Sequence, residues 1–198
     1  MSLDLWNTVG TYGTFFVIAA TALAALVQLR HMRSSNQIAA LSDLSKREGT
    51  PEFASALQFV FNRLHEKMED PAFRYQVVHA AARTEENAVL IAKIMAVGSY
   101  YEEMGLLVKS GLIDRELLFD MQSPSIVTTW DALREVTAIR RERYAPSYEN
   151  SEYLTVLAQD WLAKHPSGTY PANVRRLDVP NVWRSADEQY AAALATAV

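Results

Sequence analysis

The chain has 198 residues, of which 49% are hydrophobic and 21% are charged, and its formal net charge is −4. This composition excludes a disordered chain, and the lack of clustered Lys and Arg argues against a nucleic-acid partner. The sequence contains no cysteine, which excludes disulfides, thiol catalysis, iron–sulfur clusters and cysteine-ligated zinc.

An uncharged apolar run lies near the N-terminus. It extends from Leu5 to Leu29, which exceeds the roughly 20 residues that a helix needs to cross a bilayer. Trp6 and Tyr12 are expected at the lipid–water interface, where aromatic anchors usually lie. The sequence therefore predicts a transmembrane anchor over residues 1–30, with the lipid bilayer as a partner.

The charges beside this run predict its orientation. Arg30 and Arg33 follow it directly and no Lys or Arg precedes it, so the positive-inside rule places the C-terminal domain in the cytoplasm of an inner-membrane protein with its N-terminus outside. One alternative is a cleaved signal peptide, because Ala20-Thr21-Ala22 resembles a cleavage site. A signal peptide has a cationic start, however, and the first charge here is Asp4. A buried helix of a soluble protein is the other alternative.

The anchor helix is expected to continue beyond the membrane. Neither Gly nor Pro occurs from Thr14 to Glu48, and a helix over these residues would be about 52 Å long. Ile38, Leu41 and Leu44 fall on one side of this extension, which we call the stalk. They are expected to pack on the domain that follows.

Residues 31–166 have the pattern of an α-helical domain. Thr50-Pro51 and Asp70-Pro71 each predict an N-cap with Pro at the first helical position. Asn87–Tyr101 contains a single charge, Lys93, and is predicted to be the most buried helix. The helix after Thr50 is expected to be amphipathic, with its apolar positions at Phe53, Leu57, Val60, Phe61, Leu64 and Met68.

The second half of this domain has further helix boundaries. Gly111 is expected just after a helix end, and Asp114 is the predicted N-cap of a short helix through Phe119. Ser123-Pro124 is expected to open another helix that ends in the basic stretch Arg140–Arg143, where cations suit the helix dipole. A last helix is expected around Tyr153, Leu154, Leu157 and Trp161, with Pro166 after it.

Together these elements predict an all-α fold, in which one N-terminal transmembrane helix extends as a stalk into a cytoplasmic bundle of five to six helices. Strand-like alternation is absent.

Residues 167–198 are expected to form an extended linker and a short terminal helix. Ser185-Ala186-Asp187-Glu188 matches a capping box, and the helix is expected to end at Val198. This tail is expected to dock on a partner protein, on its own domain or on lipid, because a disordered tail would have fewer apolar residues. Those residues are Tyr170, Val174, Leu177, Val179, Val182, Trp183 and Tyr190.

No catalytic, cofactor-binding or metal-binding residue is assigned from the sequence. The four histidines, His31, His65, His79 and His165, are scattered, and neither a Glu-x-x-His nor a His-Glu-x-x-His motif occurs. No Gly-rich phosphate motif occurs either. Gly98 and Gly105 are expected to permit close helix packing.

Glu102 and Glu103 leave two interpretations open. One of them could be a buried acid that pairs with Arg140 or Arg143 as part of a site. The simpler interpretation is that these carboxylates form a salt bridge that fixes two helices, or that they lie at the edge of the helix in contact with water.

Several short segments resemble a bacterial family of single-span membrane proteins, the domain of unknown function 4760. The segments, in chain order, are Gln37–Leu41 after the apolar run, Pro51–Phe53, Tyr100–Val108, Gly111–Asp114, and Trp130 followed by Arg140. They cover roughly residues 20 to 160. The resemblance implies a membrane anchor and a helical domain, and it implies no activity.

These observations predict a membrane-anchored, non-enzymatic interaction or structural protein, such as an accessory subunit of a larger membrane complex. Its expected partner is another membrane or cytoplasmic protein. The alternative is a signalling or stress-related helical module that binds a soluble partner or ligand. A third possibility is an enzyme that uses only Glu, Arg and Tyr.

Overall fold

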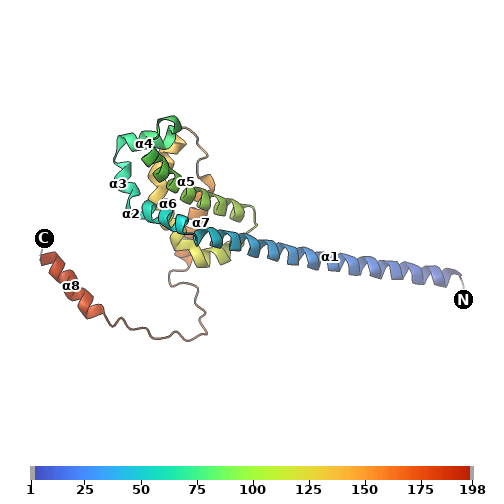
Figure 1. The fold of residues 1–198 in the computed structure, drawn as a ribbon. Helices are drawn as coiled ribbons and strands as arrows, with labels where there is room; N and C mark the ends of the chain where they lie inside the picture. The colour runs from blue at the N-terminus through green and yellow to red at the C-terminus, as the bar shows by residue number, and fades with distance from the viewer. Residues whose placement is uncertain (1–2, 197–198) are drawn as a thin grey trace. The chain divides into compact units, whose positions relative to one another are not determined.

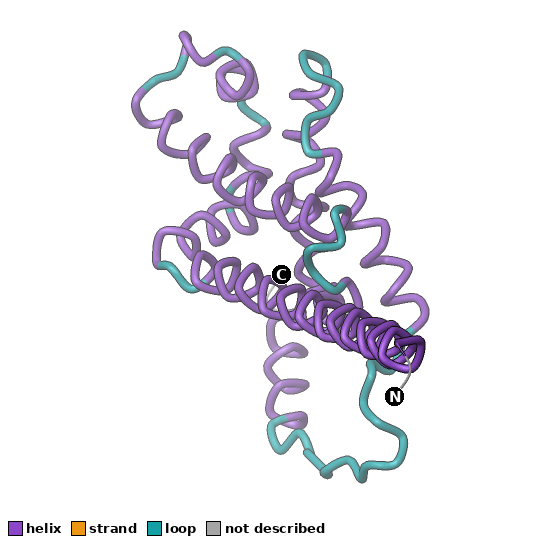
Figure 2. Tube along the Cα trace, turned by 90° about the vertical axis from the view of Figure 1, so that its right-hand side faces the viewer, coloured by secondary structure: helices purple, strands orange, loops and turns teal. Residues whose placement is uncertain are grey.

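The computed structural model describes residues 3–196, and the side chains of residue 10 and residues 12–195. In this part of the chain every regular element is helical, and no strand occurs (Figure 2). The predicted all-α fold is therefore confirmed. The chain divides into two compact units, Met1–Pro166 and Ser167–Val198. The prediction for Trp6 falls on a side chain outside the described set.

The first unit contains one long helix and a bundle (Figure 1). The long helix is α1, Leu3–Glu48, which runs for 46 residues without a break. At 1.5 Å per residue it is about 69 Å long. The bundle elements are α2 Pro51–Asn62, α3 Leu64–Met68, α4 Pro71–Val78, the 3₁₀ turn η1 Ala80–Ala82, α5 Glu85–Lys109, α6 Arg115–Arg141 and α7 Glu149–Lys164.

The predicted N-caps are present. Thr50 Oγ1 accepts the backbone N–H of Phe53 at 3.3 Å, and Asp70 Oδ1 accepts that of Ala72 at 2.8 Å. Asp114 Oδ1 accepts two N–H groups at the start of α6. Each cap satisfies a backbone donor that the first helical turn leaves unpaired. Gly111 has a φ of +67°, the left-handed conformation expected after a helix end.

The amphipathic helix predicted from Phe53 to Met68 is wrong in one respect, because it is two helices. α2 ends at Asn62, and Arg63 leaves the helical conformation with φ −131° and ψ −17°. α3 then begins at Leu64. The break changes the direction of the chain so that both Leu64 and Met68 are buried.

The prediction of two helices on either side of Ser123-Pro124 is also wrong. α6 continues through Pro124. Proline cannot donate a backbone hydrogen bond, so its usual effect is to break or kink a helix. Here Ser123 Oγ donates to the Phe119 carbonyl at 2.6 Å and Thr128 Oγ1 donates to the Pro124 carbonyl at 2.8 Å. Ser123 and Ile126 are buried, so packing on both sides of Pro124 holds the helix together.

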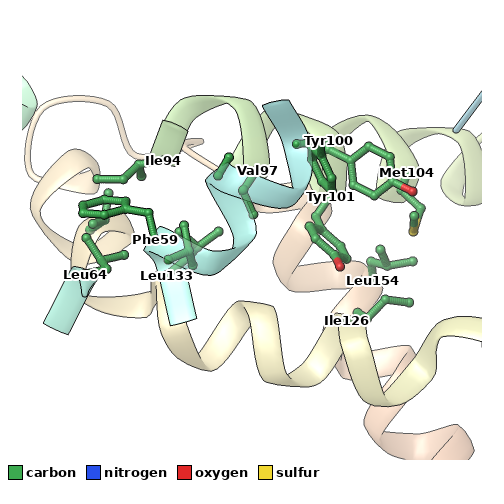
Figure 3. Close-up of a cluster of buried hydrophobic side chains, with 14 of the residues drawn as sticks. Phe59, Leu64, Ile94, Val97, Tyr100, Tyr101, Met104, Ile126, Leu133 and Leu154 are labelled. Atoms are coloured by element: carbon green, nitrogen blue, oxygen red, sulfur yellow. The ribbon is translucent and has the colours of Figure 1, made fainter. Parts of the chain in front are cut away.

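Helix α5 lies at the centre of the core, as predicted. It packs against α2 and α7, and its residues Ile94, Val97, Tyr100 and Met104 are almost completely buried. In Figure 3 these side chains point toward Phe59, Ile126, Leu133 and Leu154 from the surrounding helices. Val97 has no exposed surface. The core is therefore built around one helix that is apolar on most of its circumference.

Two glycines allow α7 to approach α5 closely, as predicted. A Cβ added to Gly98 would lie 2.4 Å from the Tyr148 ring, and one added to Gly105 would lie 2.1 Å from the Asn150 carbonyl oxygen. Both distances are too short for any side chain. Tyr148 precedes α7 with a φ of +56°, an unusual conformation for a residue with a side chain.

The second unit contains the extended segment and α8, Arg184–Thr196. The predicted capping box is wrong, because the helix begins one residue before Ser185. The side chain of Asn181 instead accepts the backbone N–H of Trp183 at 3.0 Å. The predicted end at Val198 lies outside the described residues. The seven apolar tail residues named above are exposed in the structure.

Candidate functional site

The first half of α1 has an uncovered apolar surface. From Tyr12 to Glu48 the helix is long and apolar enough to cross a membrane, and none of its most apolar stretch is buried. It is therefore not the core helix of this domain. The large side chains involved, each more than half exposed, are Tyr12, Phe15, Phe16, Val17, Ile18, Leu23, Leu26, Val27 and Leu29.

The last turns of α1 are fixed to the bundle. Leu44 is buried in the core, and Leu41 packs against it partly buried. Ile38 is 67% exposed, so the prediction that it packs on the domain is wrong. Helix geometry explains this, because Ile38 lies six residues before Leu44 and about 120° away from it around the axis.

Polar contacts complete this junction. Arg47 pairs with Glu103 of α5. The Glu48 carboxylate accepts Gln122 Nε2 of α6 at 3.2 Å and the Tyr100 hydroxyl of α5 at 3.5 Å. Further toward the apolar run, Arg33 donates to the Gly111 carbonyl at 3.4 Å. The stalk is thus connected to α5 and to α6.

An apolar groove opens beside this junction. Its volume is about 660 Å³, and it lies between α2 and α5. Phe53 and Ala56 are buried beneath it, while Val89, Ala92 and Ala96 form its α5 side and are exposed. The lining is completed by Arg47, Thr50, Pro51, Glu52, Ser55 and Lys93.

Small side chains and charged residues shape the groove. Ala92 and Ala96 are four residues apart, so they lie on one face and leave space above the helix. Lys93 Nζ donates to Ser55 Oγ at 2.9 Å, which links α5 to α2. Glu52 supplies an opposite charge at the rim. Charged side chains thus lie at the rim of a mostly apolar surface.

The two glutamates of α5 have different structural roles. Glu103 pairs with Arg47, which is the predicted salt bridge between helices. Glu102 accepts hydrogen bonds from the Ser151 N–H at 2.9 Å and the Asn150 side chain at 2.8 Å. It caps α7, so the interpretation in which it pairs with Arg140 or Arg143 is wrong.

The structure disperses the four histidines. His65 lies 3.5 Å from Glu135, His79 stacks on Tyr75, and the His165 ring contacts Trp161, while His31 is exposed on α1. Among the described residues no group of three His, Asp or Glu side chains could hold a metal ion.

Three tyrosines, two on α5 and one directly before α7, have side-chain pKa values shifted from the ordinary value. Burial is the main cause that raises the pKa of Tyr100, Tyr101 and Tyr148 above the ordinary value. The Glu48 carboxylate raises the pKa of Tyr100 further. Arg140, whose guanidinium lies 5.2 Å from the Tyr148 ring centre, acts in the opposite direction on that residue.

Sequence analysis did not identify the groove. The only signal was a set of small apolar residues on α5, Val89, Ala92 and Ala96. These cannot be distinguished from core-facing positions on a helix that is apolar all round. Sequence analysis also missed a small cavity lined by arginines, described below. Its arginines are separated by up to 60 residues and form no motif.

These features define the class of the protein, an all-α bundle that carries one helix long and apolar enough to span a membrane. The chain belongs to the family described as a domain of unknown function (DUF4760), whose model matches residues 15–161. The match includes most of the apolar part of α1 and the bundle through Trp161. No curated protein and no solved structure matches the chain.

Proposed function

We propose that the protein is a membrane-anchored, non-enzymatic interaction protein, an accessory subunit that holds its helical domain on the cytoplasmic side of the inner membrane. The observation that carries the proposal is the contrast along α1. The helix is fixed to the bundle at Leu44–Glu48, but its apolar side chains from Tyr12 to Leu29 contact no other part of the domain. Such a surface is stable in lipid and costly in water.

The orientation follows from Arg30 and Arg33 at the end of the apolar run. A phosphatase that is active only in the periplasm should be inactive when fused to the C-terminus, while a reporter that is active in the cytoplasm should be active at the same position. An active phosphatase would refute the orientation. Mass measurement of the membrane-bound protein tests the signal-peptide alternative, since a chain cleaved after Ala22 would lack residues 1–22.

We further propose that the groove between α2 and α5 receives an apolar helix of the partner protein. The support is its apolar lining, its exposure and its position at the end of the stalk. From Arg30 to Arg47 a helix extends about 27 Å, so the groove lies within reach of the cytoplasmic part of another membrane protein.

Purification from native membranes in mild detergent tests this interaction. Ala92→Glu places a charge in the groove and should release a stoichiometric partner. Ala138→Glu makes the same change at an exposed position of α6 outside the groove and should retain the partner. Loss of the partner in both variants, or in neither, would contradict the assignment of the groove.

A second candidate function is a signalling module that binds a soluble ligand. It is favoured by the arginine-lined cavity near the α6–α7 turn, which lies outside the groove. Binding of a small molecule by the isolated protein, without a stoichiometric protein partner, would support this alternative.

A further inference from the structure

A small cavity lies where the end of α4 meets the turn between α6 and α7. Its volume is about 190 Å³. Val77 and Val78 form its apolar side, and three arginines and a serine contribute polar groups. These polar residues are Arg83, Arg140, Arg143 and Ser147, Tyr144 completes the lining, and no acidic residue lines the cavity. A net charge of about +3 thus surrounds a small volume.

Two of the arginines are held in place by backbone carbonyls. Arg83 donates to the carbonyls of Gln76 at 3.0 Å and Val77 at 3.1 Å, near the C-terminus of α4. Arg143 donates to the Val78 carbonyl at 3.4 Å, and its other terminal nitrogen lies 2.5 Å from His79 Nε2. These contacts fix the orientation of the guanidinium groups. A carbonyl has only a partial charge, so the cationic charge is left uncompensated.

The other two groups have donors without partners. Arg140 donates through one terminal nitrogen to Met95 Sδ, but its buried Nε has no hydrogen-bond partner. Ser147 is 5% exposed, and its buried Oγ has no partner either. Buried polar atoms are nearly always paired, so two unpaired donors in one cavity point to a missing acceptor.

Some other arginines form ion pairs with glutamates. Arg47 pairs with Glu103 and Arg141 pairs with Glu152, the latter at 2.9 Å. Arg83, Arg140 and Arg143 take part in none of the ion pairs found among the described residues. Arg140 lines the cavity without an ion pair, whereas its neighbour Arg141 lies outside the lining and pairs with Glu152.

We propose that this cavity binds a phosphate group, with the guanidinium groups of Arg83, Arg140 and Arg143 and the hydroxyl of Ser147 as donors. Arginine is always charged and presents its N–H groups in a planar fork that matches phosphate oxygens. A water molecule occupies about 30 Å³ in the liquid, so the cavity has room for a phosphate and part of its substituent. Free phosphate and a phospholipid headgroup share this chemistry. The inference does not depend on the proposed function.

The test uses the full chain in phosphatidylcholine nanodiscs, titrated with inorganic phosphate at constant ionic strength and followed by calorimetry. Saturable binding to one site is expected. Arg140→Gln should weaken it at least tenfold. Ser147→Ala should weaken it several-fold without unfolding the domain, because it removes a hydroxyl that has no partner. The control is Arg134→Gln, which removes the same charge from an exposed position of α6 outside the cavity and should leave binding unchanged.

A second arm distinguishes the source of the phosphate. The same variants are melted in nanodiscs with and without phosphatidic acid. A rise of the melting midpoint with phosphatidic acid that Ser147→Ala and Arg140→Gln abolish, but Arg134→Gln does not, identifies a lipid headgroup. If Arg140→Gln does not fold, Arg143→Gln replaces it, since the Arg143 side chain is exposed. The proposal is overturned if neither phosphate nor phosphatidic acid has an effect that depends on these residues, or if Arg134→Gln weakens binding equally.

Discussion

The carboxylate of Glu102, in the middle of α5, accepts the backbone N–H of Ser151 at 2.9 Å and so caps a helix that begins 47 residues later in the sequence. The residue at the local N-cap position, Tyr148, supplies no side-chain hydrogen bond. A carboxylate at a helix N-terminus also interacts favourably with the helix dipole. The position of α7 therefore depends on a tertiary contact with α5.

Glu102→Ala should lower the free energy of unfolding by about 1–3 kcal/mol, because hydrogen bonds to a charged group are lost and backbone donors are left unpaired. Denaturant titration measures this change. Glu103→Ala is the matched control on the same helix, since it removes a half-exposed ion pair with Arg47 that is worth less than about 1 kcal/mol. Equal losses in the two variants would show that Glu102 is not a cap.

Gly105→Ala should destabilise the domain by about 1–3 kcal/mol or more, the usual cost of overpacking. The new methyl group would meet the Asn150 carbonyl, which belongs to the backbone and cannot move alone. Ser99→Ala introduces the same side chain at an exposed position of α5 and should be neutral or slightly stabilising. Thermal melts compare the two, and an unchanged midpoint for Gly105→Ala would exclude the close approach of α7.

Val97→Asp should prevent folding of the domain, because it buries a charge without a partner at several kcal/mol. Val97 has no exposed surface, whereas Val89 on the same helix is 59% exposed. Val89→Asp should therefore fold. Helical circular dichroism and protease resistance distinguish the two, and a folded Val97→Asp variant would mean that α5 is not central.

Stability should fall at alkaline pH. The pKa of Tyr100 is raised by burial and by Glu48, so the folded state keeps its proton above the ordinary pKa of about 10. Its contribution is complete below pH 10 and is lost as pH rises toward the folded-state pKa, because the unfolded chain ionises first. Tyr100→Phe should reduce the slope of unfolding free energy against pH above 10. An unchanged slope would contradict the assignment.

Deletion of residues 167–198 should leave the bundle folded and remove a co-purifying partner. The tail forms a unit of its own, and its apolar residues Leu177, Val179 and Trp183 are exposed. Its helix is near the length at which isolated helices are marginal in water. Affinity purification and thermal melts measure both effects. Loss of folding would instead indicate docking on the bundle, and no change in partner binding, membrane association or stability would show that the tail is dispensable.

Much of this architecture was predictable because it depends on neighbours in the sequence. The caps at Thr50, Asp70 and Asp114 form hydrogen bonds within three residues, so residue type and spacing are sufficient to locate them. The apolar run of α1 and the uncharged surface of α5 are likewise properties of consecutive residues. These features determined the all-α class, the candidate membrane helix and the central helix.

The remaining features depend on residues that are distant in sequence. Pro124 remains inside a helix because both sides of it are packed, and Glu102 finds its partners at positions 150 and 151. The groove and the arginine-lined cavity exist only where separate helices meet. The free energy of these contacts comes from burial and charge pairing between helices that are distant in the sequence. Only the tertiary structure therefore determines which arginines form ion pairs and which remain unpaired in a cavity.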